Sequence, residues 1–302
     1  EQLKLDAKDV HHEYEALISR KDLDAIMVVT PEHWHHRMTL AALKAGKDVY
    51  LEKPMSFTIA EAKEIDDVVR QTGRVLQIGA QWCSDPRYLA AREVIEKGGI
   101  GNVMWAQSTY SMNSVHGLWE YDIEKEATAQ NIDWPRFLGS APKRPFSAER
   151  YFRWRKYYPY CAGLLGDLFP HKLHPYMLAT GNPEFPARVA CVGSKKFETD
   201  KNTPNTPARD VPEIVQLIAE FPSGYVMHIT SSTVNEVGTQ EMIRGHKATL
   251  TMAGNKVELT PGRPFTEEID PYTSPAFPGE NLPNHHKNWF DSIRANKQPN
   301  AG

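Results

Sequence analysis

Three residues stand out because their types and spacing could serve acid–base chemistry on a small substrate. Lys53 lies within a Glu-Lys-Pro triplet that ends a short apolar run, and Asp167 and His171 are four residues apart. A lysine cation stabilises a developing negative charge, and an aspartate beside a histidine can raise the basicity of the imidazole and fix its orientation. Most lysines are simply solvated, but the position of Lys53 favours a function. The pattern predicts that Lys53, Asp167 and His171 form a catalytic group.

The stretch around His171 allows more than one local structure. On a helix, Asp167, His171 and His174 would share one face. Pro170 fits only the first turn of a helix and Pro175 would kink one, so Asp167 could instead be only an N-cap. The close spacing of His171 and His174 would also suit a metal, but the sequence fixes no third ligand, and histidine pairs on helices are more often polar packing. We therefore expect no metal site.

The elements that must position these residues begin with alternating strands and helices. Short apolar runs with β-branched residues are typical of buried parallel strands. The expected strands are residues 23–30, 48–51 and 75–79, and the expected helices are residues 9–21, 33–45, 56–71 and 85–97. Thr58, with Glu61 three residues later, predicts a capping box at the third helix. The alternation is typical of a doubly wound parallel sheet, which binds ligands at the carboxyl ends of its strands, where Thr30 and Lys53 lie.

The second half of the chain has a different pattern. Its expected strands are residues 103–111, 189–193, 214–221, 225–232 and 247–252, which we predict to form an open antiparallel sheet. Aromatic loops over residues 115–160 separate the first two strands, and a late helix over residues 284–296 could pack back on either domain. We therefore predict a parallel-sheet domain over residues 1–100 and an α+β domain over residues 101–302.

Two motifs and their order resemble the Gfo/Idh/MocA oxidoreductase family, named for glucose–fructose oxidoreductase and inositol dehydrogenase. The first motif is VVTPEHWHHRMTLAALKAGKDVYLEKPMS (residues 28–56), and the second is AGLLGDLFPHKLHPYMLATG (residues 162–181). The family also places a parallel unit before an open sheet. The resemblance implies an α/β protein with a Rossmann-type domain, NAD or NADP as cofactor, and oxidation of a secondary hydroxyl on a sugar, glycoside or cyclitol.

The resemblance also implies roles for individual residues. The lysine of the family's Glu-Lys-Pro reaches the reacting oxygen, which gives that role to Lys53. An acid and a histidine at the positions of Asp167 and His171 bind substrate and transfer a proton. His174 stands where the family more often has an acid. The residues assigned to the cofactor site are Thr30, Pro31, His35, Glu52, Lys53 and Pro54.

The aromatic loops are expected to hold the substrate together with His174. Flat aromatic faces suit the apolar faces of sugar rings, and arginines suit hydroxyls or carboxylates. The predicted contacts are Trp154, Arg155 and Tyr157, although a small core beneath a long loop would have the same composition.

One departure from the family concerns the dinucleotide phosphates. The glycine-rich turn that holds the pyrophosphate, G-x-G-x-x-G, does not occur in this sequence. The first elements correspond to the family only from after its second strand. We therefore expect an N-terminally truncated member of the family that binds cofactor weakly or not at all, without the residue that distinguishes NAD from NADP.

Two other functions are compatible with the same residues. Some relatives hold NAD tightly, oxidise a glycoside transiently and eliminate the aglycone, which makes them glycosidases or lyases. A second acid–base pair, such as His116 with Glu120, would favour this alternative. The third hypothesis is a non-catalytic sugar-binding relative, which the complete set of Lys53, Asp167 and His171 disfavours.

The composition argues against several other classes of protein. The net charge is −3 with no basic run for nucleic acid, and no apolar stretch approaches the roughly 18 residues of a membrane helix. Cys83, Cys161 and Cys191 lack the spacing of a disulfide framework or a metal site. The expected partners are a small carbohydrate and, by resemblance, further copies of the chain that join through the open sheet. The compartment stays open between cytoplasm and export.

Overall fold

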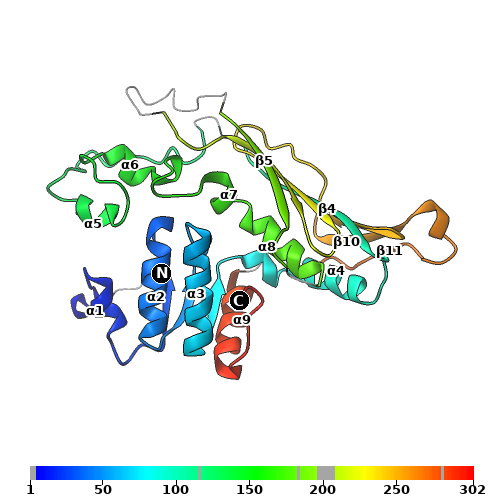
Figure 1. Cartoon of the computed structure of the whole chain (residues 1–302), viewed down its shortest axis with the longest axis horizontal. Coiled ribbons are helices and arrows are strands. Elements are labelled where there is room, and N and C mark those ends of the chain that lie inside the picture. The colour runs from blue at the N-terminus through cyan, green and yellow to red at the C-terminus, as the bar shows by residue number, and fades with distance from the viewer. Residues whose placement is uncertain (1–4, 115–116, 182–183, 196–207, 280–281) are drawn as a thin grey trace.

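The computed structural model describes residues 5–114, 117–181, 184–195, 208–279 and 282–302. Within these ranges the chain builds a small parallel sheet and a larger mixed sheet, which lie side by side (Figure 1). The predicted fold class, a partial Rossmann-type sheet followed by an α+β unit, is confirmed. Across the described ranges, no helix has both the length and the apolar character needed to cross a membrane.

Three parallel strands in the order β1-β2-β3 form the small sheet. They are Ala25–Val28 (β1), Asp48–Leu51 (β2) and Leu76–Ile78 (β3). Helices His35–Lys44 (α2) and Ile59–Thr72 (α3) follow the first two strands. Every residue of the central strand β2 is buried, including Asp48. The predicted alternation of strands and helices is therefore confirmed.

Helix α3 begins with the predicted capping box. The Thr58 side chain accepts a hydrogen bond from the Glu61 backbone (3.2 Å), and the Glu61 carboxylate accepts one from the Thr58 backbone (3.1 Å). Gly73 ends the helix with a φ of 64°, a left-handed conformation that glycine adopts without steric cost. Both helix ends therefore have their backbone groups satisfied by local sequence.

The first predicted helix, residues 9–21, is much shorter in the structure. It is divided into a 3-10 turn at Ala7–Asp9 (η1) and a short helix at Tyr14–Ile18 (α1). Only Ile18 of these residues is buried. Because short helices depend on packing rather than on propensity, so little buried surface does not support a longer one.

Eight strands form the larger sheet in the order β11-β10-β9-β8-β4-β7-β6-β5. They are Val103–Ser111 (β4), Arg188–Ser194 (β5), Ile214–Glu220 (β6), Val226–Ser232 (β7), Met242–Gly245 (β8), Ala248–Ala253 (β9), Lys256–Pro261 (β10) and Tyr272–Thr273 (β11). The prediction of a purely antiparallel sheet is wrong, because β4 and β7 pair in parallel. A parallel pair needs a long crossover connection, and the chain between β4 and β7 supplies one.

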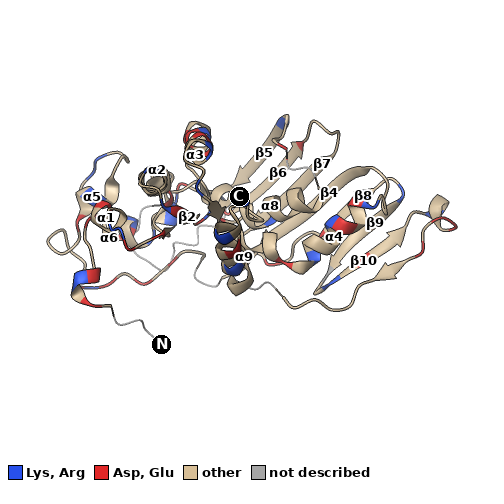
Figure 2. Ribbon diagram, turned by 90° about the horizontal axis from the view of Figure 1, so that it is seen from below, with Lys and Arg blue, Asp and Glu red and all other residues tan. Residues whose placement is uncertain are grey.

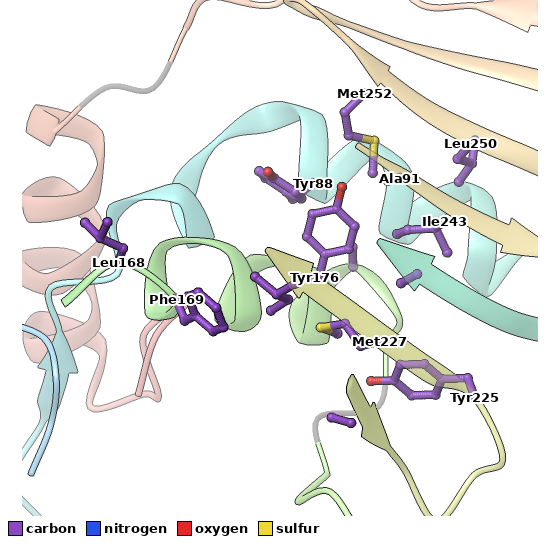
Figure 3. Packing of buried hydrophobic residues seen from close by; sticks show 14 of the residues in the cluster. Tyr88, Ala91, Leu168, Phe169, Tyr176, Tyr225, Met227, Ile243, Leu250 and Met252 are labelled. Atoms are coloured by element: carbon purple, nitrogen blue, oxygen red, sulfur yellow. The ribbon is translucent and has the colours of Figure 1, made fainter. Parts of the chain in front are cut away.

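Helices Pro86–Glu96 (α4) and Pro170–Ala179 (α8) cover one face of the larger sheet (Figures 1 and 2). Figure 3 shows the core between helices and strands. Its fully buried side chains include Tyr88, Tyr176, Met227, Ile243 and Leu250. Fully burying an apolar side chain stabilises a fold by about 1.5–3 kcal/mol, so this core holds α8, which carries His171, firmly against the sheet.

The end of the chain returns to the small sheet. Helix Leu282–Ala295 (α9) follows the larger sheet in sequence, yet its Trp289 ring lies 5.6 Å from the ring of Tyr50 in β2. Ile78 of β3 donates a backbone hydrogen bond to Ala301 (2.8 Å). The predicted late helix therefore packs on the first domain.

The aromatic loops form a small unit above the end of β1. This unit contains Trp134–Leu138 (α5), Ala148–Phe152 (α6) and the 3-10 turn Trp154–Lys156 (η4), and its own core consists of Trp134, Leu138, Ala141, Tyr157 and Tyr160. Trp34, in the 3-10 turn Glu32–Trp34 (η2) after β1, donates from Nε1 to the Phe137 carbonyl (3.0 Å). The aromatic unit is thereby fixed to the small sheet.

Candidate active site

Lys53 and Asp167 meet at the carboxyl end of the small sheet. Lys53 follows β2, and Asp167 ends the short helix Gly163–Asp167 (α7). Lys53 Nζ donates hydrogen bonds to Asp167 Oδ1 (2.5 Å) and to the Asp167 carbonyl oxygen (2.7 Å). The two side chains are only 12% and 8% exposed. Charge-assisted bonds in such a setting are stronger than those at the surface, so the pair holds the lysine amine in one place.

Arg155 supplies a second cation to the same carboxylate. Its Nε lies 3.4 Å from Asp167 Oδ1, and its guanidinium lies 4.1 Å from the centre of the Trp154 ring. Trp154 and Arg155, both predicted to contact substrate, are partly exposed beside the Lys53–Asp167 pair. Asp167 is not an N-cap, since Phe169 occupies that position of α8 without a side-chain hydrogen bond.

Glu32 is a buried carboxyl group that the sequence analysis did not single out. It is 2% exposed, and its Oε2 accepts a hydrogen bond from the Ala162 backbone (2.6 Å). Its Oε1 is buried and has no hydrogen-bond partner in the part of the chain that the structure describes. Burial, and then the nearby Asp167 charge, raise the pKa of Glu32 to about 8. The sequence could have indicated Glu32 as a site residue, because it comes two residues after Thr30, at the carboxyl end of a predicted strand.

Glu52 is the third carboxyl group of this site. Burial raises the pKa of Glu52, and its Oε2 accepts a hydrogen bond from the Lys53 backbone (3.3 Å). Gly79, which follows β3, makes room for it, because a Cβ at this position would lie 2.8 Å from the Glu52 carboxylate. We call Glu32, Glu52, Lys53, Arg155 and Asp167 the site cluster.

His171 lies near the site cluster but does not form the predicted pair with Asp167. Its Nδ1 is buried and has no hydrogen-bond partner among the described residues, and its ring stacks on Tyr110 with ring centres 5.3 Å apart. The prediction that Asp167 raises the basicity of His171 is wrong. Burial, and then the charge of Lys53, lower the pKa of His171 to about 4, which outweighs the opposing effect of Asp167. Burial likewise lowers the pKa of His174 to about 4.

Tyr157 does not have the predicted contact with substrate. It is fully buried, and its hydroxyl donates to Glu149 (3.0 Å). Glu149 belongs to a buried square of charges, which we call the ion network: Glu120, Glu149, Arg153 and Lys156. Tyr157 therefore belongs to the core of the aromatic unit, which was the alternative that its composition allowed. The proposed partner of Glu120, His116, lies outside the described residues.

His35 connects the two loops that carry the predicted cofactor residues. Its Nδ1 lies 2.7 Å from the Pro54 carbonyl and its Nε2 lies 2.8 Å from the Thr30 carbonyl. Because both partners are acceptors and burial lowers the pKa of His35, the neutral ring donates to one of them at a time. The ring thus fixes the spacing between Thr30-Pro31 and Glu52-Lys53-Pro54.

The strand ends fit part of a dinucleotide. The Thr30 hydroxyl is buried without a partner among the described residues, at the edge where parallel sheets bind nucleotides. Thr30 and the Glu52-Lys53-Pro54 loop, which were predicted to bind the cofactor, both lie at this edge, whereas the sequence has no glycine-rich turn for the pyrophosphate. Among the described residues, no group of three His, Cys, Asp or Glu side chains is placed to bind a metal ion.

Known proteins resemble this chain in sequence. Residues 2–80 match the family described as "Oxidoreductase family, NAD-binding Rossmann fold" (GFO_IDH_MocA). Inositol 2-dehydrogenase of Klebsiella pneumoniae subsp. pneumoniae is 34% identical over 108 residues, which cover 35% of this chain and 32% of that protein. The scyllo-inositol 2-dehydrogenase (NAD(+)) of Bacillus subtilis is 34% identical over 83 residues, which cover 28% of this chain and 24% of that protein. Each match thus spans less than two thirds of the relative.

Solved structures resemble nearly the whole chain in fold. A levoglucosan dehydrogenase in complex with NADH and levoglucosan superposes with a TM-score of 0.70 at 20% identity, over 95% of this chain and 75% of that one. The order of a parallel sheet and then a larger sheet is therefore shared beyond the region of clear sequence similarity. Residues 2–80 are therefore similar to the NAD-binding part of the Gfo/Idh/MocA oxidoreductases, and the rest of the described chain shares its fold with the solved structure.

Proposed function

We propose that the protein is an NAD(P)-dependent oxidoreductase that acts on a secondary hydroxyl of a sugar, glycoside or cyclitol. The observation that carries the proposal is the hydrogen bond of 2.5 Å between Lys53 and Asp167, at the carboxyl end of the parallel sheet. This edge is where such sheets bind dinucleotides. The pair places an amine that can exchange a proton beside the expected nicotinamide.

The proton steps follow from this pair. When bound, the nicotinamide donates or accepts the hydride. In the reducing direction the Lys53 ammonium, held by Asp167, gives a proton to the oxygen of the ketone as that oxygen becomes a hydroxyl. In the oxidising direction the neutral Lys53 amine takes the same proton back. Arg155 supports the carboxylate of Asp167 when the charge of the lysine changes.

His171 has a different part in this proposal. With a pKa lowered to about 4, it is neutral near pH 7 and is a poor general base. A neutral imidazole can donate or accept a hydrogen bond, and we assign it the orientation of a substrate hydroxyl. His174, Trp154 and Arg155 are the proposed further contacts, and the names of the inositol and levoglucosan dehydrogenases support a cyclic polyol or sugar.

The open face of the larger sheet is the proposed interface for further copies of the chain. The strand pairing places Trp105, Val192 and Ile218 on the face opposite α4 and α8, where they are 39%, 71% and 50% exposed. Exposed apolar side chains gathered on one face are typical of protein contact surfaces. The proposal is therefore a homo-oligomer that buries this face.

A binding and turnover assay tests the proposed reaction. We expect calorimetry to detect NAD⁺ or NADP⁺ binding, and myo-inositol or levoglucosan to produce reduced cofactor. Lys53→Met should lower kcat/KM about 10²-fold to 10⁴-fold, and Lys63→Met, at an exposed position of α3, should leave it unchanged. Protein expressed from the full-length open reading frame that contains this chain and that binds neither cofactor would overturn the proposal. Release of nitrophenol from nitrophenyl glycosides without net cofactor reduction would support the glycosidase alternative.

A further inference from the structure

The ring of His171 is held by aromatic side chains from two other elements. Tyr110 of β4 stacks on it at 5.3 Å with an interplanar angle of 27°, and Trp82, in the 3-10 turn Gln81–Ser84 (η3), lies 6.1 Å away. Trp82 and Tyr110 also stack on each other, with ring centres 5.7 Å apart. Because Nδ1 of His171 has no partner among the described residues, these ring contacts are what orient the imidazole.

Lys172 fixes the other side of this aromatic group. Its Nζ lies 3.6 Å from the centre of the Trp82 ring and forms an ion pair with Glu241. Glu241 in turn accepts a hydrogen bond from the Ser108 hydroxyl of β4 (3.2 Å). Lys172 itself is only 5% exposed. The lysine next to His171 in sequence thus connects α8 with η3 and with the larger sheet.

Burying the Lys172 cation costs desolvation free energy, which an apolar side chain of similar size would not. Replacing a buried ion pair by apolar side chains of similar volume is often neutral or stabilising, so packing alone does not require Lys172 and Glu241. What an apolar pair could not supply is a fixed positive charge beside the imidazole. The charged and titratable groups that act on His171 are Lys53, Asp167, Lys172 and His174.

We infer that Trp82, Tyr110, Lys172 and Glu241 are positioning residues, which together form a clamp on His171. The clamp sets the angle of the ring with Nδ1 turned inward, which leaves Nε2 as the nitrogen for the substrate. The charge of Lys172 opposes a second proton on the ring. This inference rests on the proposed function for its catalytic meaning, but the orientation and protonation of His171 can be measured without any substrate.

The first test follows His171 by NMR in protein with isotopically labelled histidine, with the signal assigned by comparison with His171→Gln. The wild-type ring should titrate near pH 4. Lys172→Met combined with Glu241→Gln removes both charges, and we expect the midpoint of His171 to rise by about half a unit to one unit. The NMR signals of His246, which is exposed, serve as the internal control and should be the same in variant and wild type. An unchanged midpoint of His171 in the folded double variant would overturn the role of Lys172.

The second test removes the stacked ring. Tyr110→Leu should change the His171 chemical shifts and lower kcat about 10-fold to 100-fold with little change in KM, whereas Tyr110→Phe keeps the ring and should behave as wild type. Phe221→Leu is the matched control, because it removes a stacked ring at 4.4 Å from Tyr225, away from the site. If Tyr110→Leu and Phe221→Leu leave the His171 signals equally unchanged, the clamp does not exist. If the signals change but no substrate is turned over, the proposed function fails and the clamp stands.

Discussion

The molecule contains two groups of buried charge that differ in how their charges are matched. In the ion network, each carboxylate contacts both cations: Lys156 lies 2.6 Å from Glu120 and 2.8 Å from Glu149, and Arg153 lies 2.5 Å and 3.0 Å from the same two residues. In the site cluster, three carboxyl groups share two cations. Of these carboxyl groups, Glu32 has only a backbone N–H as its hydrogen-bond partner among the described residues.

The difference separates charge that is matched within the fold from charge at the proposed active site. In the ion network each carboxylate faces two cations, and Arg209 lies 3.8 Å from Glu120 as well. These ion pairs join α6 and η4 to the loop that contains Glu120. The site cluster is left with an excess of acid, a buried carboxyl group of raised pKa and a partly exposed arginine. Perturbed groups with unmatched partners are typical of active sites. Burial of charge by itself therefore does not mark a site, whereas an unmatched charge at a strand end does.

The largest expected effect concerns activity at the site cluster. Lys53→Met should lower kcat/KM about 10²-fold to 10⁴-fold, because it removes the group proposed to exchange the proton. Its effect on the free energy of unfolding should be smaller than that of a cation removed from the ion network. Arg155 remains beside Asp167, and Lys53 and Arg155 are 12% and 30% exposed, whereas Lys156 is fully buried. The measurements are steady-state kinetics and urea unfolding of the same samples. Full activity in the folded variant would remove Lys53 from the reaction.

The next largest effect concerns stability at the ion network. Lys156→Met should lower the free energy of unfolding by about 3–5 kcal/mol, because it leaves Glu120 and Glu149 buried with one cation fewer. Urea unfolding of Lys156→Met and of Lys53→Met measures how much unfolding free energy each variant loses. An equal loss of stability in both variants would show that the ion network and the site cluster do not differ in how their charges are matched.

The site could be predicted from the sequence where it depends on local order. A strand that ends in Glu-Lys-Pro places Lys53 at the carboxyl edge of the sheet whatever the rest of the chain does, and the structure puts it there. The capping box of Thr58 is equally local and was predicted. The partner of Asp167 was not, because the spacing of four residues assumed one helix. The chain instead ends α7 at Asp167 and begins α8 at Pro170, which turns the carboxylate to Lys53.

The remaining misses depend on contacts between distant segments. The parallel pairing of β4 with β7 joins residues more than a hundred positions apart, as in the pair Trp105–Val226, and periodicity within one strand does not specify its neighbour. The two-residue strand β11 is too short to show a period. Tyr157 looked like a sugar contact because composition cannot tell an inward aromatic ring from an outward one. The clamp on His171 likewise requires rings from η3, β4 and α8 that only the fold brings together.

The smallest expected effect measures the unmatched charge directly. The pKa of Glu32 is raised in the folded chain to about 8 from 4.5, so between these values the unfolded chain has lost a proton that the folded chain keeps. Stability therefore falls as pH rises through this window, and Glu32→Gln should abolish that part of the slope. We expect the variant to gain about 1–3 kcal/mol on wild type between pH 6 and pH 8. Urea unfolding across this range measures the gain, and the exposed Glu267→Gln should follow the wild-type curve. A Glu32→Gln curve parallel to wild type would mean that Glu32 is already ionised at pH 6, and that the acid excess of the site cluster is compensated after all.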